Sequence, residues 1–388
     1  MQQTNSIRNR PIFKYLLVQT FFMAVALNGW NAIYTNFAKE VVLLNGEQIG
    51  FIQSVRELPG LLSVSLLLVL LLVKEMRLMS LSIMLVGIGT VAAGYMSYYH
   101  GVLICTLVMS LGFHYAESIS QSLTLQHYST TESPLIIGAL RSATSAGSFG
   151  VGLVMFLLAD LVPYHGLFLV MGVGCFLAGV WGVLQKDIPP RNNTPQRKMV
   201  LKKDYLLFYI LTLLSGARRQ IFVVFSVLLL VERFGFSLRE MTFLFLLNHL
   251  INWILNRYIG KTINAFGERK LLTVKYALLA AVFVAYAFSD NRLLVASLYV
   301  LEQLFFNLTV AIRTFFQKIA DPRDIAPTMA VGVTMNHVAA VAVPTIGGIL
   351  WMFDYRLPFF MGLGFALAAL VCVQFMDKQL AKMTQPAA

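Results

Sequence analysis

The chain has 388 residues, of which 58% are hydrophobic and 12% are charged, and its mean hydropathy is +0.72. A water-soluble domain carries roughly 25% charged residues, so a large soluble domain is excluded and an integral membrane protein is indicated. The formal net charge of +12 would suggest nucleic acid as the partner of a soluble protein, but in a membrane protein the basic residues must first be assigned to loops.

Runs of about 20 apolar residues that are bounded by charges or turn residues predict membrane-spanning helices. The first run follows basic residues and has no small-residue cleavage site, so we expect a retained helix rather than a signal peptide. The pattern predicts an all-α integral membrane protein with twelve transmembrane helices, over residues 13–38, 47–73, 78–98, 101–126, 134–160, 164–185, 204–231, 239–257, 271–289, 292–317, 326–351 and 357–376.

The basic loop residues predict the orientation of these helices. With the N-terminus in the cytoplasm, most loop lysines and arginines fall on the cytoplasmic side, and we count Lys275 at the start of the ninth helix among them. Only Lys39, Arg233, Arg239, Arg292 and Arg356 fall outside. This positive-inside bias places both termini in the cytoplasm and explains the net charge without nucleic acid. We expect a multi-pass plasma membrane protein, in the inner membrane if the source is a Gram-negative bacterium.

Polar residues interrupt the first predicted helix near its middle. Asn28 and Asn31 flank Trp30 there, and we expect all three to contribute to a substrate site.

The second predicted helix carries Arg56 and Glu57 directly before a Pro59-Gly60 pair. Adjacent helical residues point about 100° apart, so we expect Arg56 and Glu57 not to pair with each other. Each is then either locked to a neighbouring helix or part of the transport pathway, in which case Glu57 is a candidate proton carrier.

The fourth and fifth predicted helices hold three further ionisable residues. His114 and Glu117 are three positions apart and share a helix face, and Arg141 lies at a similar depth in the next helix. An ion pair between Arg141 and Glu117 would be structural, or it would make Glu117 a proton carrier that responds when a substrate competes for Arg141. We leave both interpretations open and include His114 with the coupling residues.

The longest hydrophilic segment, Lys186 to Asp204, divides the chain into six helices before it and six after it. We therefore predict a six-helix bundle over residues 1–185, a cytoplasmic linker over 186–203 and a second bundle over 204–388. This arrangement is typical of a transporter whose halves rock about a site at the midplane.

The seventh predicted helix contains two consecutive arginines, Arg218 and Arg219, close to its middle. A charge at the bilayer centre costs about 2.5–3.5 kcal/mol on insertion scales, so these side chains bind an anion, are neutralised by Glu302 in the tenth helix, or mark an error in the helix boundary. A planar guanidinium suits a carboxylate or a phosphate.

The eighth predicted helix has a polar stripe of Asn248, Asn252 and Asn256, with His249 beside it. Such a stripe is either interhelical hydrogen bonding, worth about 0.6 kcal/mol per contact, or part of a polar site. His249 and His337 are either packing residues or proton relays.

The loop after the eighth predicted helix reads Gly260-Lys-Thr-Ile-Asn264-Ala-Phe-Gly267-Glu268-Arg269-Lys270. It resembles the G-x-x-x-D-x-x-G-R-R-R loop motif of the major facilitator superfamily, with Asn264 in place of Asp and Glu268 in place of the first Arg. In that family the motif is a cytoplasmic gate latch. The resemblance thus implies a gating role for Gly260, Asn264, Gly267, Arg269 and Lys270.

A second segment, Pro344-Thr-Ile-Gly347-Gly348, is similar to the P-x-x-G-G element of the same family. Small residues permit close helix approach and Pro permits a bend. In the family, helices 1, 4, 7 and 10 line a central cavity. This favours a cavity role for helix 7 and for Glu117. From the intramembrane charges and the polar residues at similar depth, we expect a substrate site of Arg218, Arg219, Arg141, Asn28, Asn31, Trp30, Asn307 and Asn336, with proton coupling through Glu117, Glu302, Glu57 and His114.

From these features we expect a monomeric secondary active transporter of a small organic solute, anionic or amphiphilic, that works by alternating access through proton antiport and export. The alternatives are an uptake carrier or facilitator for an organic anion and a non-transporting sensor or scaffold. The chain has no phosphate-binding loop, no nucleophile elbow and no metal-ligand spacing, and its three cysteines are far apart. We therefore expect no enzyme activity, no cofactor and no metal.

Overall fold

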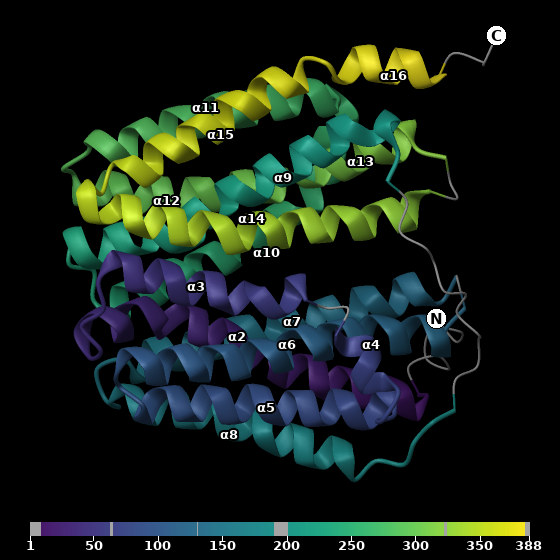
Figure 1. Cartoon of the computed structure of the whole chain (residues 1–388), viewed down its shortest axis with the longest axis vertical. Helices are drawn as coiled ribbons and strands as arrows, with labels where there is room; N and C mark the ends of the chain where they lie inside the picture. Colours follow the sequence, from purple (N-terminus) through teal and green to yellow (C-terminus); the bar gives the residue numbers. More distant parts are fainter. Residues whose placement is uncertain (1–8, 63–64, 130, 190–200, 322–323, 385–388) are drawn as a thin grey trace. The chain divides into compact units, whose positions relative to one another are not determined.

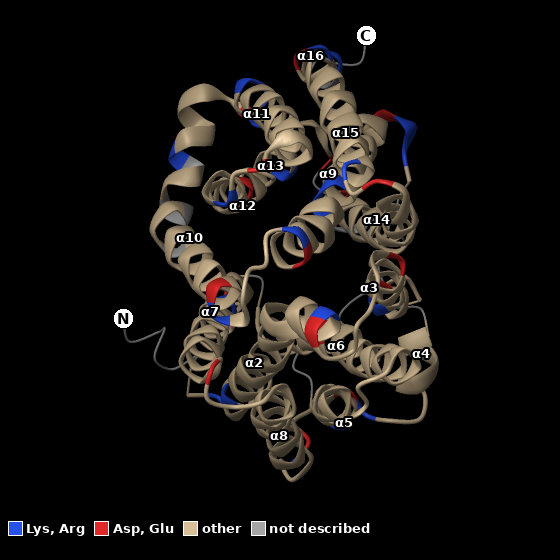
Figure 2. Cartoon of the chain, turned by 90° about the vertical axis from the view of Figure 1, so that its left-hand side faces the viewer, with Lys and Arg blue, Asp and Glu red and all other residues tan. Residues whose placement is uncertain are grey.

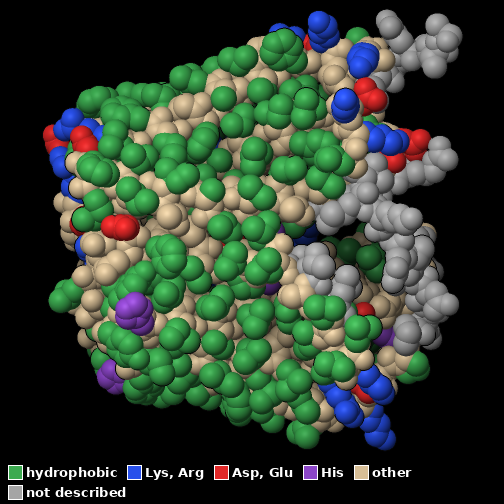
Figure 3. All heavy atoms as spheres, in the orientation of Figure 1, with side chains coloured by type: hydrophobic (Ala, Val, Ile, Leu, Met, Phe, Trp, Pro, Cys, Tyr) green, Lys and Arg blue, Asp and Glu red, His purple; other side chains and the backbone are tan. Residues whose placement is uncertain are grey.

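The computed structural model describes residues 9–62, 65–129, 131–189, 201–321 and 324–384. Within these residues the chain is helical, and ten helical segments are long and apolar enough to cross a membrane. The remaining helices are α3 (Gly46–Leu61) with α4 (Ser65–Leu70), which follow α2 in the chain, and α10 (Leu238–Phe266). Apolar side chains cover most of the face seen in Figure 3, whereas charged side chains gather towards the helix ends. The chain is therefore an all-helical membrane protein.

The chain divides into two compact units. Unit 1 comprises Met1–Leu43, Leu58–Gln196 and Ser237–Leu246. Its main helices are α2 (Pro11–Glu40), α5 (Glu75–Tyr95), α6 (Tyr99–His127), α7 (Ser133–Leu158) and α8 (Tyr164–Val183). Helix α5 packs against α6 and α8, and α2 packs against α7 and α8.

Unit 2 comprises Leu44–Glu57, Arg197–Phe236 and Leu247–Ala388. Its helices, besides most of α3 and α10, are η1 (Lys203–Tyr205), α9 (Leu206–Gln220), η2 (Ile221–Ser226), η3 (Leu229–Arg233), α11 (Glu268–Phe288), α12 (Arg292–Asn307), α13 (Val310–Ile319), α14 (Ile325–Phe353), α15 (Leu357–Val373) and α16 (Met376–Thr384). Helix α9 packs against α14 and α15, and α11 packs against α15.

Local sequence explains where several helices begin. Proline occupies the first turn of α2, α7 and α15, where its missing N–H is not needed and its fixed φ suits the helix. The Asn291 side chain accepts a hydrogen bond from the Leu294 N–H at the start of α12. Gly267 has φ +75° between α10 and α11, a left-handed conformation that favours glycine.

Three predicted helices differ from the observed ones. In the second, α3 ends at Leu61, two residues beyond Pro59, and Leu62 is a turn, while the tenth is broken at Leu308–Thr309 between α12 and α13. The eighth, predicted to end at residue 257, continues to Phe266 because the residues before Gly267 are compatible with a helix. Gly260 and Asn264 are therefore helical and not part of a loop.

The close helix approach predicted for Gly347 and Gly348 is confirmed. A Cβ at Gly348 would lie 2.8 Å from the Gly46 carbonyl oxygen, and one at Gly347 would lie 2.4 Å from the Phe225 ring. Gly50 is equally restricted, because a Cβ there would lie 2.2 Å from the Pro344 carbonyl oxygen. Helix α3 thus packs on α14 through backbone contacts that larger residues would prevent.

A similar ion pair occurs in each unit just before its first long helix. In unit 1, Arg10 binds Glu132 in the α6–α7 connection through both carboxylate oxygens, at 2.6 and 3.1 Å. In unit 2, Lys202 binds Asp324, just before α14, at 2.5 Å. Arg10 holds the pKa of Glu132 below its ordinary value, and Lys202 does the same for Asp324. Each pair fastens the start of one helix to a distant connection.

Candidate functional site

The most deeply buried ion pair among the described residues joins the two helices α9 and α12 of unit 2. Arg218 Nη1 lies 3.3 Å from Glu302 Oε1, and the two side chains are 1% and 0% exposed. Internal neutralisation by Glu302 is one of the alternatives that the sequence leaves open for the two arginines, and it is the arrangement found for Arg218. Ionisable groups this deep in an apolar protein are retained for a specific purpose more often than for stability.

The contacts of this pair leave part of the guanidinium unused. Ser226 Oγ donates a 3.4 Å hydrogen bond to Glu302 Oε2, but Arg218 Nε and Nη2 are buried without an acceptor among the described residues. Ser226 ends η2, a π-helical turn that begins at Ile221 directly after α9, and such turns are frequent at functional sites. Two nitrogens of Arg218 are therefore available to a further anionic group beside Glu302.

Lys275 is a second buried cation, and the prediction that it lies on the cytoplasmic side among the loop residues is wrong. We counted it among the cytoplasmic loop residues, but it lies within α11 and its exposure is 0%. Its Nζ donates a 2.8 Å hydrogen bond to Thr309 Oγ1 at the break between α12 and α13, and Arg218 is near enough to repel its charge. Lys275 lay inside a predicted helix with apolar residues on both sides, and this was the signal that could have identified it.

Arg219 and Asn307 have contacts that differ from those of Arg218. The Arg219 guanidinium lies over the Phe306 ring, 5.6 Å from its centroid, and its side chain is only partly buried. Asn307 donates a 2.5 Å hydrogen bond to Asn252. The polar stripe of the eighth predicted helix thus provides interhelical hydrogen bonding at Asn252. Phe306 and Asn307 adjoin the break in the tenth passage.

Asn336 packs on the turn before Arg218. A Cβ at Gly216 would lie 2.4 Å from Asn336 Oδ1, so only glycine lets this amide approach α9 so closely. Asn336 therefore contacts α9 two residues before the buried Arg218, and its role in a substrate site stays a prediction.

Arg56 and Glu57 correct an expectation from the sequence. Arg56 Nη2 lies 3.0 Å from Glu57 Oε1, although neighbouring helical residues diverge. Both side chains are long and flexible, so their charged ends meet although their Cα–Cβ bonds point in different directions. Glu57 Oε2 also lies 3.4 Å from His337 Nδ1 of α14. Glu57 is thus held between a permanent cation and a histidine.

The remaining predicted site residues belong to unit 1. Trp30 is 1% exposed and stacks on Tyr34, with ring centroids 4.1 Å apart. Asn28 donates to the Ala24 carbonyl oxygen of its own helix at 3.0 Å, while Asn31 is half-buried.

His114 is buried on α6, whereas Glu117 on α6 and Arg141 on α7 are exposed. An ion pair between Glu117 and Arg141 stays a prediction. Both side chains are exposed on the surface of the protein, where they face either lipid or a water-filled cavity.

Residues of the predicted gate latch pair within unit 2. Glu268 binds Lys318 at the end of α13, at 2.7 Å, and Arg269 binds Asp377 of α16. Lys270 and Asn264 are exposed. Gly267 provides the turn that lets α11 begin beside these partners. The charges of the motif therefore connect three helix ends.

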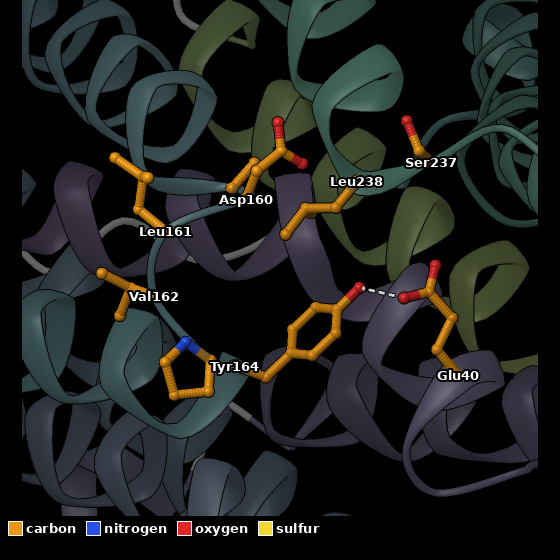
Figure 4. Close-up of a pocket in the computed structure, with 9 residues that line it drawn as sticks. Glu40, Asp160, Leu161, Val162, Tyr164, Ser237 and Leu238 are labelled. Carbon is orange, nitrogen blue, oxygen red and sulfur yellow. Dashed lines mark hydrogen bonds between the residues drawn. The ribbon is translucent and has the colours of Figure 1, made fainter.

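A pocket of about 370 Å³ in unit 1 is bordered by the C-terminal end of α2, the α7–α8 connection and the start of α10. Figure 4 shows Tyr164 pointing across it to Glu40, with a 2.7 Å hydrogen bond. The other acidic residue, Asp160, pairs with Arg239 at 2.8 Å. Since both acids already have partners, this pocket is a weaker candidate than the buried cluster of unit 2. In the end-on view of Figure 2, few charged residues, blue or red, stand among the tan helices.

Comparisons with known proteins agree on the fold. The sequence model of the family described as "Major Facilitator Superfamily" matches residues 16–326. A search of curated proteins found no match.

Several solved transporter structures are similar to this chain. The nucleoside transporter NupG is 12% identical with a TM-score of 0.75, and the alignment covers 95% of this chain and 100% of that one. A bacterial homologue of the human lysosomal transporter Spinster, inward-facing and occupied, is 12% identical with a TM-score of 0.79 over 97% and 98%. A POT family transporter in complex with 5-aminolevulinic acid is 13% identical with a TM-score of 0.74 over 96% of both chains.

Proposed function

The chain belongs to the major facilitator superfamily, and we propose that it couples protons to the transport of a small organic anion that binds at Arg218 and Glu302. As a member of this family it is a secondary transporter in the plasma membrane and not an enzyme. The observation that carries the proposal is a buried guanidinium with two nitrogens lacking an acceptor among the described residues, next to a carboxylate that can take up a proton.

The two members of the pair differ in their chemistry. Arg218 stays charged at every physiological pH, whereas a glutamate can be neutralised. An anion that binds Arg218 competes with Glu302 for the same positive charge, so Glu302 becomes easier to protonate. By reciprocity, protonation of Glu302 frees Arg218 and strengthens anion binding.

This reciprocity determines the sign of coupling. A proton and an anion that favour each other at one site move together, so we propose cotransport in place of the antiport expected from the sequence. Export, also expected from the sequence, would then occur when the outward driving force on the anion exceeds the inward proton-motive force. Antiport would instead require that proton and ligand exclude each other.

The neighbouring groups suit the rest of an organic ligand. Arg219 is partly exposed and lies over Phe306, so it offers a planar hydrogen-bond donor beside an aromatic surface, outside the fully buried cluster. Asn307 and Asn336 provide amides at the break of the tenth passage and beside Gly216. We propose that these groups hold the organic portion of the substrate, which makes an amphiphilic anion the preferred ligand.

Proteoliposomes containing the purified protein test the proposal. We expect uptake of a radiolabelled organic anion to be driven by an inwardly directed proton gradient, and Glu302→Gln to abolish this drive while anion exchange continues. Glu47→Gln removes an exposed carboxylate and is the matched control. Gradient-driven accumulation by Glu302→Gln equal to that of the wild type would contradict the coupling role. No flux across a broad panel of organic anions would instead favour the sensor or scaffold.

A further inference from the structure

The buried cluster of unit 2 contains one more cation than the proposed function uses. Arg218, Lys275 and Glu302 are each 1% exposed or less. Two cations and one carboxylate would leave a positive charge that nothing among the described residues balances. A buried charge without a counter-charge is so costly that the titratable group becomes neutral instead. Of the two cations, only the lysine can become neutral by losing a proton, because arginine stays charged.

We propose that Lys275 is a second cation of the anion site, neutral when the site is empty and protonated when a doubly charged anion occupies it. The inference rests on the proposed function and deepens it, because it names the substrate class. With Glu302 protonated, Arg218 and a protonated Lys275 balance two negative charges. Small dicarboxylates and phosphate monoesters carry that charge.

Charge balance then gives one proton per negative charge of the ligand, up to two. A monoanion needs only the proton on Glu302, since Arg218 alone balances it. A dianion also needs the proton on Lys275. In each state the buried cluster, ligand included, has no net charge, and this minimises the cost of desolvation.

The surroundings of Lys275 supply no other group that balances it. Helix α9 contributes Arg218, and α12 contributes Glu302, which is already paired. On the neighbouring α15, the titratable group of this region is Cys372, which lies near Tyr276.

The charged residues of α13, which also packs against α11, point elsewhere. Arg313 and Lys318 are exposed, and Lys318 is bound to Glu268. On α11 itself, the Tyr276 ring lies 4.9 Å from Lys275 Nζ. An anion that binds beside the free nitrogens of Arg218 is therefore the partner that would let Lys275 keep a charge.

Calorimetric titration of the purified full-length protein tests the inference with matched ligands. Succinate is compared with monomethyl succinate, and methyl phosphate with dimethyl phosphate, because each pair differs by one charge at similar size. Measurements at one pH in buffers of different ionisation enthalpy give the number of protons bound with each ligand. We expect about two protons with the dianion that binds and about one with its monoanion. The pair that shows this difference identifies the dicarboxylate or the phosphate monoester as the ligand chemistry.

Two variants of Lys275 separate a role in charge from a role in packing. Lys275→Arg cannot lose its proton, so we expect the proton count with the dianion to fall to about one. Lys275→Met should weaken dianion binding at least about tenfold more than monoanion binding. Lys261→Met, an exposed lysine on α10, is the matched control, and the melting temperature of each variant reports folding.

The outcomes distinguish the inference from the proposed function. An unchanged count of two protons in folded Lys275→Arg overturns the role of Lys275. If the two Lys275 variants behave as expected, but Glu302→Gln binds as many protons as the wild type, the proposed coupling through Glu302 is overturned instead. Absence of binding by all four ligands overturns the anion site as a whole.

Discussion

The Arg218 guanidinium and the Glu302 carboxylate lie 3.3 Å apart with no more than 1% of either side chain exposed. The bond joins α9 to α12, and the carboxylate also accepts a longer hydrogen bond from Ser226, at 3.4 Å. Because this pair has few supporting hydrogen bonds, its attraction only partly repays the desolvation of two charges. Stability and function therefore place different demands on these residues, and mutation can separate them.

We predict that breaking this pair destabilises the protein more than removing it. Arg218→Gln leaves a buried carboxylate uncompensated, which costs about 3–5 kcal/mol in the free energy of unfolding. The double variant Arg218→Met/Glu302→Leu leaves neither charge and should recover most of that loss. Denaturant unfolding in detergent checks both. If the double variant were no more stable than Arg218→Gln, the loss of stability would come from disturbed packing and not from an unpaired charge.

Arg219 should affect ligand affinity, because its side chain is partly exposed and lies over Phe306. Arg219→Lys keeps the charge but loses the planar group, and we expect the KM for transport to rise roughly two- to tenfold. Phe306→Leu should give a rise of the same order. Arg292→Lys is the control, because Arg292 also lies over an aromatic ring, that of Phe236, at an exposed helix start. Equal effects of Arg219→Lys and Arg292→Lys would remove Arg219 from the site.

The sequence predicted the helical membrane fold because that information is local. Apolar runs of spanning length identify helices regardless of their neighbours, and Gly347-Gly348 marked a close contact that the structure confirms. The pairing of Arg218 with Glu302 was also within reach, since an intramembrane charge needs a partner and the second half of the predicted bundle offered one acid.

The other contacts were out of reach because they depend on register and side-chain conformation. The apolar residues around Lys275 signalled its burial, but its contact with Thr309 depends on where α11 begins, and this is set by the single turn at Gly267. The bond between Arg56 and Glu57 depends on two flexible side chains bending together, which the helical angle alone does not describe. The break between α12 and α13 at Thr309 contains no proline or glycine, so the sequence there does not indicate it.

The ion pair before α14 predicts a dependence of stability on pH. Lys202 at 2.5 Å and the Tyr205 hydroxyl at 2.7 Å both stabilise the charged form of Asp324, so its pKa is below the ordinary 3.8. A lowered pKa adds stability above the unfolded value that is lost as the pH falls through the folded value. We expect Asp324→Asn to lower the melting temperature at neutral pH, and the difference from the wild type to shrink as the pH falls below 3.8.

The control for that prediction is Asp204→Asn, which removes an exposed ion pair with Lys382. Such pairs contribute little, so this variant should melt close to the wild type throughout. If the difference in melting temperature between Asp324→Asn and the wild type stayed constant down to acid pH, the contribution of Asp324 would come from its hydrogen-bond geometry and not from its charge.

Gly50 should be the most sensitive glycine of the α3–α14 contact. An added Cβ would lie 2.2 Å from the Pro344 carbonyl oxygen and 3.0 Å from the Gly348 Cα, and neither backbone atom can move as a side chain can. We expect Gly50→Ala to cost about 1–3 kcal/mol in the free energy of unfolding. Gly364→Ala on α15 is the matched control, because nothing lies within 4 Å of its Cβ. There the higher helix propensity of Ala should leave stability unchanged or raise it by up to about 1 kcal/mol. Equal melting temperatures for the two variants would mean that α3 does not need its backbone contact with α14.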